Sequence, residues 1–270
     1  MKSEPADLSS LQNPKVKLAV RLRDRRDRDT TGLYLIEGYR ELLRAHQGQT
    51  EVETLFICHE LFLGTNEGKL IQNLRESGAT VYTCTASVFQ KLSYRDRPDG
   101  LLAIAKQHHR LLTDLQPSAN PFLVVAEAIE KPGNLGTILR SSDAVGLDAL
   151  LVCDRCTDIF NPNVVRASVG TLFSVPVIEC TGADALDWLR ENGIQILAAT
   201  PQAKAVYTDV DLTGPVAIAV GTEQLGLSEL WMDGADLQVS IPMRGMADSL
   251  NVATATTLLL YEVLRQRTLA

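Results

Sequence analysis

Residues 241–252, IPMRGMADSLNV, join the apolar end of a strand to the start of an apolar helix. Ile241-Pro-Met243 has the character of a buried strand end, and Ser249 is of the type that begins helices. The polar connection between them is longer than a simple turn needs, and its Gly245 is expected to let the backbone bend closely. This junction therefore has the features of a binding loop at the edge of a sheet.

The first half of the chain alternates short strands with amphipathic helices. We predict a first domain over 1–112, a linker over 113–120 that ends in a Pro/Ser/Asn cluster, and a second domain over 121–270. In the first domain the apolar periodicity predicts helices over 13–28, 39–47, 66–77 and 87–93, and strands over 34–38, 52–58, 80–84 and 100–106.

The second half alternates in the same way, with more apolar strands. Strands are predicted over 122–129, 149–153, 175–180, 194–200, 215–220 and 237–243. Helices are predicted over 134–146, 161–171, 183–192, 226–232 and 249–267. Runs of Val, Ile, Leu and Ala separated by helices are typical of a parallel sheet covered on both faces, so the predicted fold class is α/β.

The composition is that of an ordinary globular protein. Of 270 residues, 45% are hydrophobic and 22% are charged, and no apolar run approaches the roughly 18 to 20 residues that a membrane span needs. The N-terminus lacks the apolar core of a signal peptide, and the five cysteines are odd in number and scattered. We therefore expect a cytoplasmic protein with no membrane partner.

Charge is distributed unevenly along the chain. The formal net charge is −7, yet residues 1–110 carry 17 Lys and Arg against 14 Asp and Glu, and the remainder carries 9 against 19. The basic excess is sharpest in KVKLAVRLRDRRDRD (15–29), with seven cations and three Asp. This segment is either a solvated helix face with local ion pairs or a surface that contacts phosphates. The second interpretation requires its arginines to converge on one face.

Three loops at predicted strand ends carry more glycine and polar residues than turning requires. In open parallel sheets, ligands bind beyond the carboxyl ends of the strands, which is where these loops lie. They are EKPGNLGTILR (130–140), GTEQLGLSE (221–229) and the junction IPMRGMADSLN (241–251).

Several common site types are excluded by these sequences. Gly133 and Gly136 have neither the spacing of the dinucleotide fingerprint nor that of a P-loop, and the chain contains no GxSxG. Cys153 and Cys156 have the CxxC spacing, but one pair supplies at most two ligands and no second pair lies nearby in the sequence. We expect no metal site.

Taken in order, the three loops contain three sequence blocks. The blocks are Asn134-Leu-Gly136-Thr-Ile-Leu-Arg140, then Gly221-Thr-Glu223-Gln-Leu-Gly226, then Ile241-Pro-Met243 followed by Ser249-Leu250-Asn251-Val252. Together they resemble the signature blocks of the SpoU/TrmH branch of the SPOUT methyltransferases and span about residues 130 to 260. The chain departs from the family at Ala253, where many members carry Ser.

The resemblance implies an enzyme that transfers a methyl group from S-adenosylmethionine (AdoMet) to a ribose 2′-hydroxyl of RNA. The family fold is a parallel sheet whose C-terminal segment forms a deep trefoil knot, an exception to the rule that chains do not knot. The first half resembles the family's frequent N-terminal extension, a small ribosomal-protein-like domain that binds substrate RNA. The similar features are Asn13-Pro14 before a basic helix and a strand that ends in Glu37-Gly38.

The resemblance also assigns cofactor contacts. They fall at Thr200, Gly221, Ile241, Met243 and Leu250. The apolar side chains of this set would form the walls that an adenine ring needs.

The residues that the resemblance assigns to the reaction are Asn134, Arg140, Glu223, Ser249 and Asn251. An arginine stays protonated at neutral pH, so we expect Arg140 to hold the target phosphate or to stabilise the developing alkoxide. The Asn and Ser side chains would orient the ribose or support that arginine, and Glu223 would fix the loop geometry. Each has a structural alternative: Ser249 and Asn134 as helix caps, and Glu223 as an acceptor for loop N–H groups.

The resemblance further implies a homodimer, and five apolar residues of helix 249–267 (Leu258, Leu259, Leu260, Val263 and Leu264) fit a partner surface. Ribosomal RNA is the favoured substrate because a separate RNA-binding domain comes first; transfer RNA is the alternative, and no DNA partner is expected. An RNA-binding dimer without catalysis is the second hypothesis. A nicotinamide- or flavin-dependent oxidoreductase is the third, and the missing fingerprint disfavours it.

Overall fold

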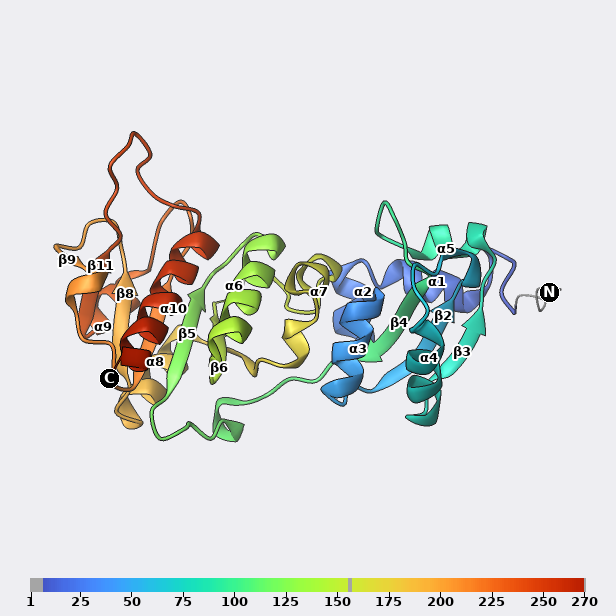
Figure 1. Cartoon of the computed structure of the whole chain (residues 1–270), viewed down its shortest axis with the longest axis horizontal. Coiled ribbons are helices and arrows are strands. Elements are labelled where there is room, and N and C mark those ends of the chain that lie inside the picture. The colour runs from blue at the N-terminus through green and yellow to red at the C-terminus, as the bar shows by residue number, and fades with distance from the viewer. Residues whose placement is uncertain (1–6, 155–156, 270) are drawn as a thin grey trace. The chain divides into compact units, whose positions relative to one another are not determined.

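The computed structural model of the chain describes residues 7–154 and 157–269. These residues form two compact units, each with its own sheet (Figure 1). The first unit contains the described residues up to His108 together with Asp158–Ser174, and the second contains the described residues of His109–Thr157 and those from Val175 onward. The segment Asp158–Ser174 therefore packs with the N-terminal residues, although it lies between two strands of the second unit in the sequence.

The first unit is built on a four-stranded mixed sheet in the order β1-β4-β2-β3. Strand β4 runs antiparallel to both of its neighbours, and β2 and β3 are parallel. The strands are β1 (Leu33–Glu37), β2 (Val52–Ile57), β3 (Thr80–Thr83) and β4 (Leu101–Lys106). The helices are α1 (Pro14–Arg21), α2 (Arg25–Thr31), α3 (Tyr39–Gln47), α4 (Glu67–Glu76), α5 (Ala86–Leu92) and α7 (Pro162–Ser168), with the 3₁₀ turns η1 (His59–Leu61) and η3 (Thr171–Phe173).

The basic N-terminal segment forms two helices, not the single helix predicted over 13–28. Helix α1 ends at Arg21, and Leu22 is fully buried. Asp24 then caps α2, because its side chain accepts a hydrogen bond from the backbone N–H of Arg26. Asp24, three residues after the end of α1, therefore starts a second helix.

The second unit contains a seven-stranded sheet in the order β7-β6-β5-β10-β8-β11-β9, in which every neighbouring pair is parallel. The predicted parallel α/β sheet is confirmed. Its strands are β5 (Phe122–Glu127), β6 (Ala149–Cys153), β7 (Val177–Cys180), β8 (Gln195–Ala199), β9 (Ala205–Val206), β10 (Val216–Val220) and β11 (Leu237–Ser240). The short strand β9 carries only two residues and was missed by the sequence analysis.

Helices cover both faces of this sheet. They are α6 (Pro132–Val145), α8 (Gly182–Glu191), α9 (Glu229–Gly234) and α10 (Val252–Leu269), with the 3₁₀ turns η2 (Leu112–Asp114) and η4 (Tyr207–Asp209). Helices α6 and α10 lie side by side (Figure 1), while α8 and α9 pack together with the alternate residues of the strands. The core on the α8–α9 side includes Leu123, Val125 and the fully buried Trp231. Adjacent strand residues point to opposite faces and both faces are covered, so every residue of β5, β6 and β10 is buried.

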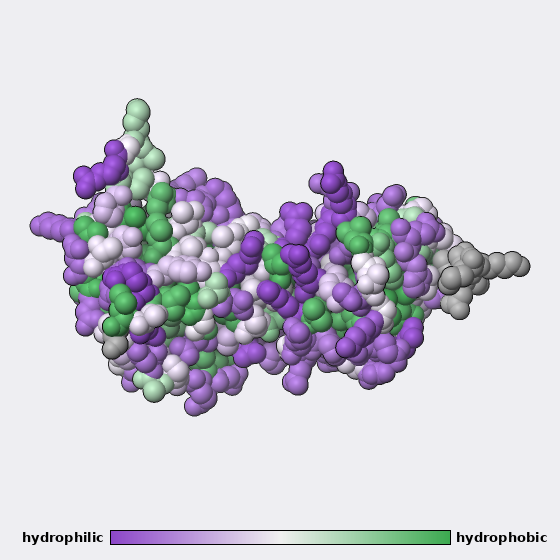
Figure 2. Space-filling view, in the orientation of Figure 1, coloured by the Kyte–Doolittle hydropathy of each residue, from purple (hydrophilic) through white to green (hydrophobic). Residues whose placement is uncertain are grey.

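The junction quoted from the sequence is a loop over its whole length. Strand β11 ends at Ser240 and α10 begins at Val252, so the strand predicted to Met243 and the helix predicted from 249 are both shorter. The loop projects from the surface of the second unit (Figures 1 and 2), and residues 244–249 are exposed. Gly245 has open space around it and an ordinary φ, so no close approach requires glycine there. The trefoil knot stays a prediction.

Across the described residues, no helix is both long enough and apolar enough to cross a bilayer.

Candidate active site

A cavity of about 680 Å³ opens at the carboxyl ends of β8, β10 and β11. All five residues expected to contact the cofactor line it: Thr200, Gly221, Ile241, Met243 and Leu250. These residues follow three different strands, and the parallel sheet brings the strand ends together at one edge. Whether they hold a cofactor stays a prediction.

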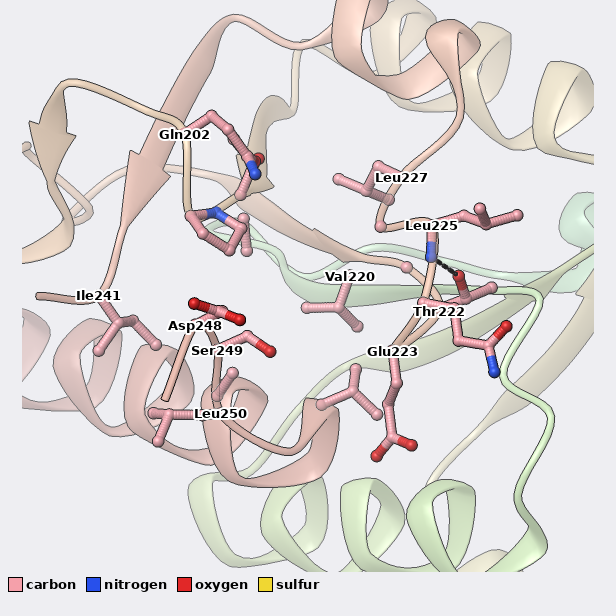
Figure 3. Close-up of a pocket in the computed structure, with 18 of the residues that line it drawn as sticks. Gln202, Val220, Thr222, Glu223, Leu225, Leu227, Ile241, Asp248, Ser249 and Leu250 are labelled. Carbon is pink, nitrogen blue, oxygen red and sulfur yellow. Dashed lines mark hydrogen bonds between the residues drawn. The ribbon is translucent and has the colours of Figure 1, made fainter. Parts of the chain in front are cut away.

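The loop after β10 forms one wall of this cavity (Figure 3). The backbone N–H of Thr222 donates to the carbonyl of Gly226, and the N–H of Gly226 donates to the carbonyl of Thr222. The chain thus folds back onto Gly221, where a Cβ would lie 2.1 Å from the carbonyl oxygen of Gly226. Gly226 itself has a φ of +70°, in the left-handed region that favours glycine. Both glycines of the second block are therefore needed to build the wall.

Three of the predicted reaction residues form one hydrogen-bonded cluster beside the cavity. Glu223 accepts hydrogen bonds through Oε1 from Nδ2 of Asn134 at 3.1 Å and from Nδ2 of Asn251 at 2.6 Å. Nδ2 of Asn251 also lies 3.0 Å from Oδ1 of Asn134. The cluster joins the first, second and third sequence blocks through direct side-chain contacts.

The cluster has a fourth member, which the sequence motifs did not single out. Lys131 donates from Nζ to Oε2 of Glu223, and this hydrogen bond is the largest cause that lowers the pKa of Glu223. The hydrogen bond from Asn134 lowers that pKa further. Glu223 is thus held as a carboxylate whose two oxygens are both occupied. Lys131 lies within the first loop, three residues before Asn134, and that proximity is the signal that the sequence offered.

Asn251 has a second role, as the N-cap of α10. Its Oδ1 accepts hydrogen bonds from the backbone N–H groups of Ala253 at 3.0 Å and Thr254 at 3.4 Å. The cap assigned to Ser249 as a structural alternative therefore belongs to Asn251, because the helix begins three residues later than predicted. One amide thus connects the end of α10 to Glu223.

Ser249 and Arg140 lie outside this cluster. Ser249 lines the large cavity together with Asp248, and both side chains point into the space between Ile241 and Val220 (Figure 3). Arg140 is exposed on α6 and makes no hydrogen bond or ion pair with any described residue. It is six residues after Asn134, about 9 Å along a helix axis. Arg140 lines neither this cavity nor the smaller one beside Asn134.

Polar residues that the sequence analysis did not select also line the cavity. Oγ1 of Thr200 donates to Oε1 of Gln202 at 2.5 Å, and Thr222, Gln224 and Asp248 also line the cavity. Neither Lys nor Arg nor His is among the described residues that line it. A single Gln or Asp in a loop carries no sequence signal, so only the fold identifies these positions.

The basic segment 15–29 divides between structural and free cations. Arg28 is buried and pairs with Asp158 at 2.7 Å, and Arg23 donates to the carbonyl oxygens of residues 91–93. Arg25 pairs with Asp29. Two of the three cations of α2 are therefore paired within the first unit, but only the Arg25–Asp29 pair is of the exposed, local kind that the ion-pair interpretation expected.

Cys153 and Cys156 have the CxxC spacing that many metal sites use. Cys156 lies outside the described residues, and Cys153 is buried with its Sγ 3.8 Å from that of Cys180. No group of three or more His, Cys, Asp or Glu side chains that could hold a metal ion occurs in the described part of the chain.

Residues 121–261 match the model of the SpoU rRNA Methylase family, and residues 13–103 match that of the MRM3-like substrate binding domain. The chain belongs to the SpoU family. The family blocks Asn134 to Arg140, Gly221 to Gly226 and Ile241 to Val252 all fall within the matched residues. The resemblance identified from the three blocks is confirmed.

Relatives of this SpoU family member share most of its length. A 23S rRNA guanosine 2′-O-methyltransferase of Bacillus subtilis is 28% identical over 95% of this chain and 98% of its own. A 23S rRNA uridine 2′-O-methyltransferase of Streptomyces viridochromogenes is 32% identical over 91% and 87%. A crystal structure of an RNA 2′-O ribose methyltransferase is 41% identical, covers 97% of this chain and 99% of that one, and has a TM-score of 0.85.

An AdoMet-bound rRNA methyltransferase from Sinorhizobium meliloti has the same fold. It is 30% identical, covers 96% of this chain and 97% of that one, and has a TM-score of 0.88. The chain and its solved relatives therefore share both the sheet with its surrounding helices and the N-terminal unit.

Proposed function

We propose that this chain transfers a methyl group from AdoMet to a ribose 2′-hydroxyl of ribosomal RNA. The observation that carries the proposal is the Asn134–Glu223–Asn251 cluster beside the large cavity, in a member of the SpoU family. It joins the three family blocks at one point of the sheet edge. Relatives that align along most of the chain carry names of 23S rRNA 2′-O-methyltransferases, which supports ribosomal over transfer RNA.

The cavity residues fit AdoMet. The volume of the cavity lies within the range of about 300–1,000 Å³ typical of small-molecule sites. Ile241 and Leu250 offer apolar walls for adenine, while Thr200 and Gln202 offer polar groups. Gly221 brings backbone close to the cavity without a side chain in the way. When bound, AdoMet supplies a methyl group on a sulfonium, which is a good leaving group.

The chain's own residues would position the ribose hydroxyl. We assign Asn134 and Asn251 to orienting the ribose, with Glu223 holding both amides in place through Oε1. Positioning of this kind supplies much of the rate in a displacement that has a good leaving group. Glu223 is already fully engaged as a carboxylate, so we assign it a positioning role and not that of the general base. Ser249, on the cavity wall, is assigned to orienting the ribose together with the two amides.

Arg140 is assigned to a phosphate of the RNA. It is exposed, and it lacks a partner among the described residues. A guanidinium binds a phosphate through two parallel hydrogen bonds, which would fix the RNA backbone relative to α6.

A homodimer in the cytoplasm completes the proposal. Of the five apolar residues of α10 that suggested a partner surface, Leu259, Leu260 and Val263 are buried within the unit itself. Exposed Leu258 and the adjacent exposed Tyr261 remain for a partner. Light scattering at micromolar concentration, with activity measured on the same sample, tests this: a fully active monomer would contradict it.

The reaction is tested with AdoMet labelled in its methyl group. Incubation with unmodified 23S ribosomal RNA and with total transfer RNA, followed by mapping of 2′-O-methyl positions, is expected to give one labelled ribose in the ribosomal RNA. Label in transfer RNA alone would indicate that transfer RNA, and not ribosomal RNA, is the substrate. Absence of transfer to either RNA, with AdoMet bound, would favour an RNA-binding protein without catalysis.

A further inference from the structure

The two units differ in charge. The described residues of the first unit carry 16 Lys and Arg against 14 Asp and Glu, whereas those of the second unit carry 8 against 18. RNA binding depends strongly on contacts between cations and phosphates. Long-range attraction for RNA must therefore come from the first unit, and it requires a surface where cations are not neutralised by neighbouring acids.

Helices α1 and α5 form such a surface. Helix α1 (PKVKLAVR) contains three cations and no acid, and α5 (ASVFQKL) contains one cation and no acid. The two helices pack on each other, with Val16 and Ala19 of α1 in the same core cluster as Val88, Phe89 and Leu92 of α5. The buried residues of α1 fix which face points to the core, so Lys17 and Arg21, four residues apart, share the solvent face.

Arg23 holds the end of α5, which carries Lys91, next to the end of α1. Its Nη2 donates to the carbonyl oxygens of Lys91 at 2.7 Å, Leu92 at 2.9 Å and Ser93 at 2.8 Å. A cation at the carboxyl end of a helix is favoured by the helix dipole. Arg23 follows Arg21 by two residues, so the end of α1 and the exposed Lys91 are held close together.

The remaining cations of α1 are available to a ligand. Nζ of Lys15 lies 4.9 Å from the centre of the Tyr82 ring, a contact that positions its charge without neutralising it. Arg21 has one acidic partner, Asp27, at 3.5 Å, and its side chain is 62% exposed. An exposed ion pair of this kind contributes little and exchanges readily for a phosphate.

We propose that this α1–α5 face, defined as Lys17, Arg21 and Lys91, contacts the phosphates of the substrate RNA. The proposal rests on the proposed function only for its choice of RNA as ligand. It separates the basic segment 15–29 into two parts: Lys17 and Arg21 bind RNA, while Arg23 and Arg28 hold the first unit together.

The test compares two variants with the same change in composition. Lys17→Gln with Arg21→Gln removes one Lys and one Arg from the α1–α5 face. Lys69→Gln with Arg75→Gln removes one Lys and one Arg from α4, where both side chains are exposed and the helix also contains Glu67 and Glu76. Affinity for a 23S ribosomal RNA transcript is measured over a series of salt concentrations, without AdoMet.

The α1 variant is expected to bind about tenfold more weakly near physiological salt. Two lost phosphate contacts should also reduce the slope of log affinity against log salt by roughly 1.4 to 1.8. The α4 variant should stay within about twofold of the wild type. Equal losses in both variants, or no loss in the α1 variant, would overturn the proposal.

Thermal unfolding checks that both variants are folded. If the α1 variant is not, the single changes Lys91→Gln and Lys69→Gln make the same comparison with one contact. Binding and methylation are read separately, so the two proposals can fail independently. A wild type that binds RNA through this face but transfers no methyl group would overturn the proposed function alone.

Discussion

Gly221→Ala tests whether the loop after β10 builds the cofactor cavity. An added Cβ would lie 2.1 Å from the carbonyl oxygen of Gly226 and 2.5 Å from the backbone nitrogen of Leu227. Ordinary contact begins at 3.4 Å, so the backbone of Gly226 must move by 3.4 − 2.1 = 1.3 Å. Both atoms belong to the backbone of a loop closed by two hydrogen bonds with Thr222, and no side-chain rotation relieves the clash.

Overpacking of this kind lowers the free energy of unfolding by about 1–3 kcal/mol. For a protein of this size each kcal/mol lowers the Tm by about 2–4 °C. Because the displaced loop is a cavity wall, AdoMet affinity should fall at least tenfold, which corresponds to about 1.4 kcal/mol of binding free energy. Calorimetric titration with AdoMet and thermal unfolding measure the two effects on the same preparation.

Gly133→Ala is the matched control. Gly133 lies in α6 with no atom within 4 Å of an added Cβ and with an ordinary φ. The same substitution there should stabilise the helix by about 0.4–1 kcal/mol and leave AdoMet affinity unchanged. If Gly221→Ala binds AdoMet as tightly as the control variant, the loop does not shape the cofactor site and the reasoning is wrong.

Three further predictions concern single side chains. Arg140→Ala should lower the methylation rate in single turnover by about 100-fold or more while AdoMet affinity stays constant; an undiminished rate would remove Arg140 from the reaction. Asn251→Ala should lower the free energy of unfolding by about 0.5–2 kcal/mol, because α10 loses its cap. Asn251→Ser keeps a cap acceptor but loses the amide that reaches Glu223, so it should recover Tm but not rate; identical Tm values for the two variants would contradict the cap. Burial is the main cause that raises the pKa of Glu37, so the folded state binds this proton more tightly than the unfolded state. The free energy of unfolding should therefore fall as pH rises from the usual carboxyl range through that raised pKa, and Glu37→Gln should flatten this part of the urea-unfolding profile.

The helix boundaries show where local sequence is ambiguous. Ser249 and Asn251 are both good N-cap residues, and nothing in their neighbours separates them. The choice falls on Asn251, whose amide also reaches Glu223, 28 residues away in the chain. That contact exists only when β10 and the start of α10 meet at the sheet edge.

The basic segment 15–29 shows the same limit for charge. Its composition is compatible with an RNA surface and with internal ion pairs. Arg28 has a structural role because it pairs with Asp158. This partner lies 130 residues further along the chain, in the segment that packs with the first unit. No local pattern connects these two residues, so the division into structural and free cations required the packed unit.

By itself, the sequence determined the parallel α/β sheet and the family, because apolar runs and block motifs are local properties of the chain. The family resemblance also assigned cavity residues as distant as Thr200 and Leu250, and these meet because the ends of parallel strands gather at one edge of the sheet. Tertiary structure alone decided that Lys131 completes the Glu223 cluster, that Asn251 caps α10, and that Asp158–Ser174 joins the first unit. The physical reason is that hydrogen bonds and ion pairs between distant residues depend on which side chains the packed strands and helices bring within about 3 Å.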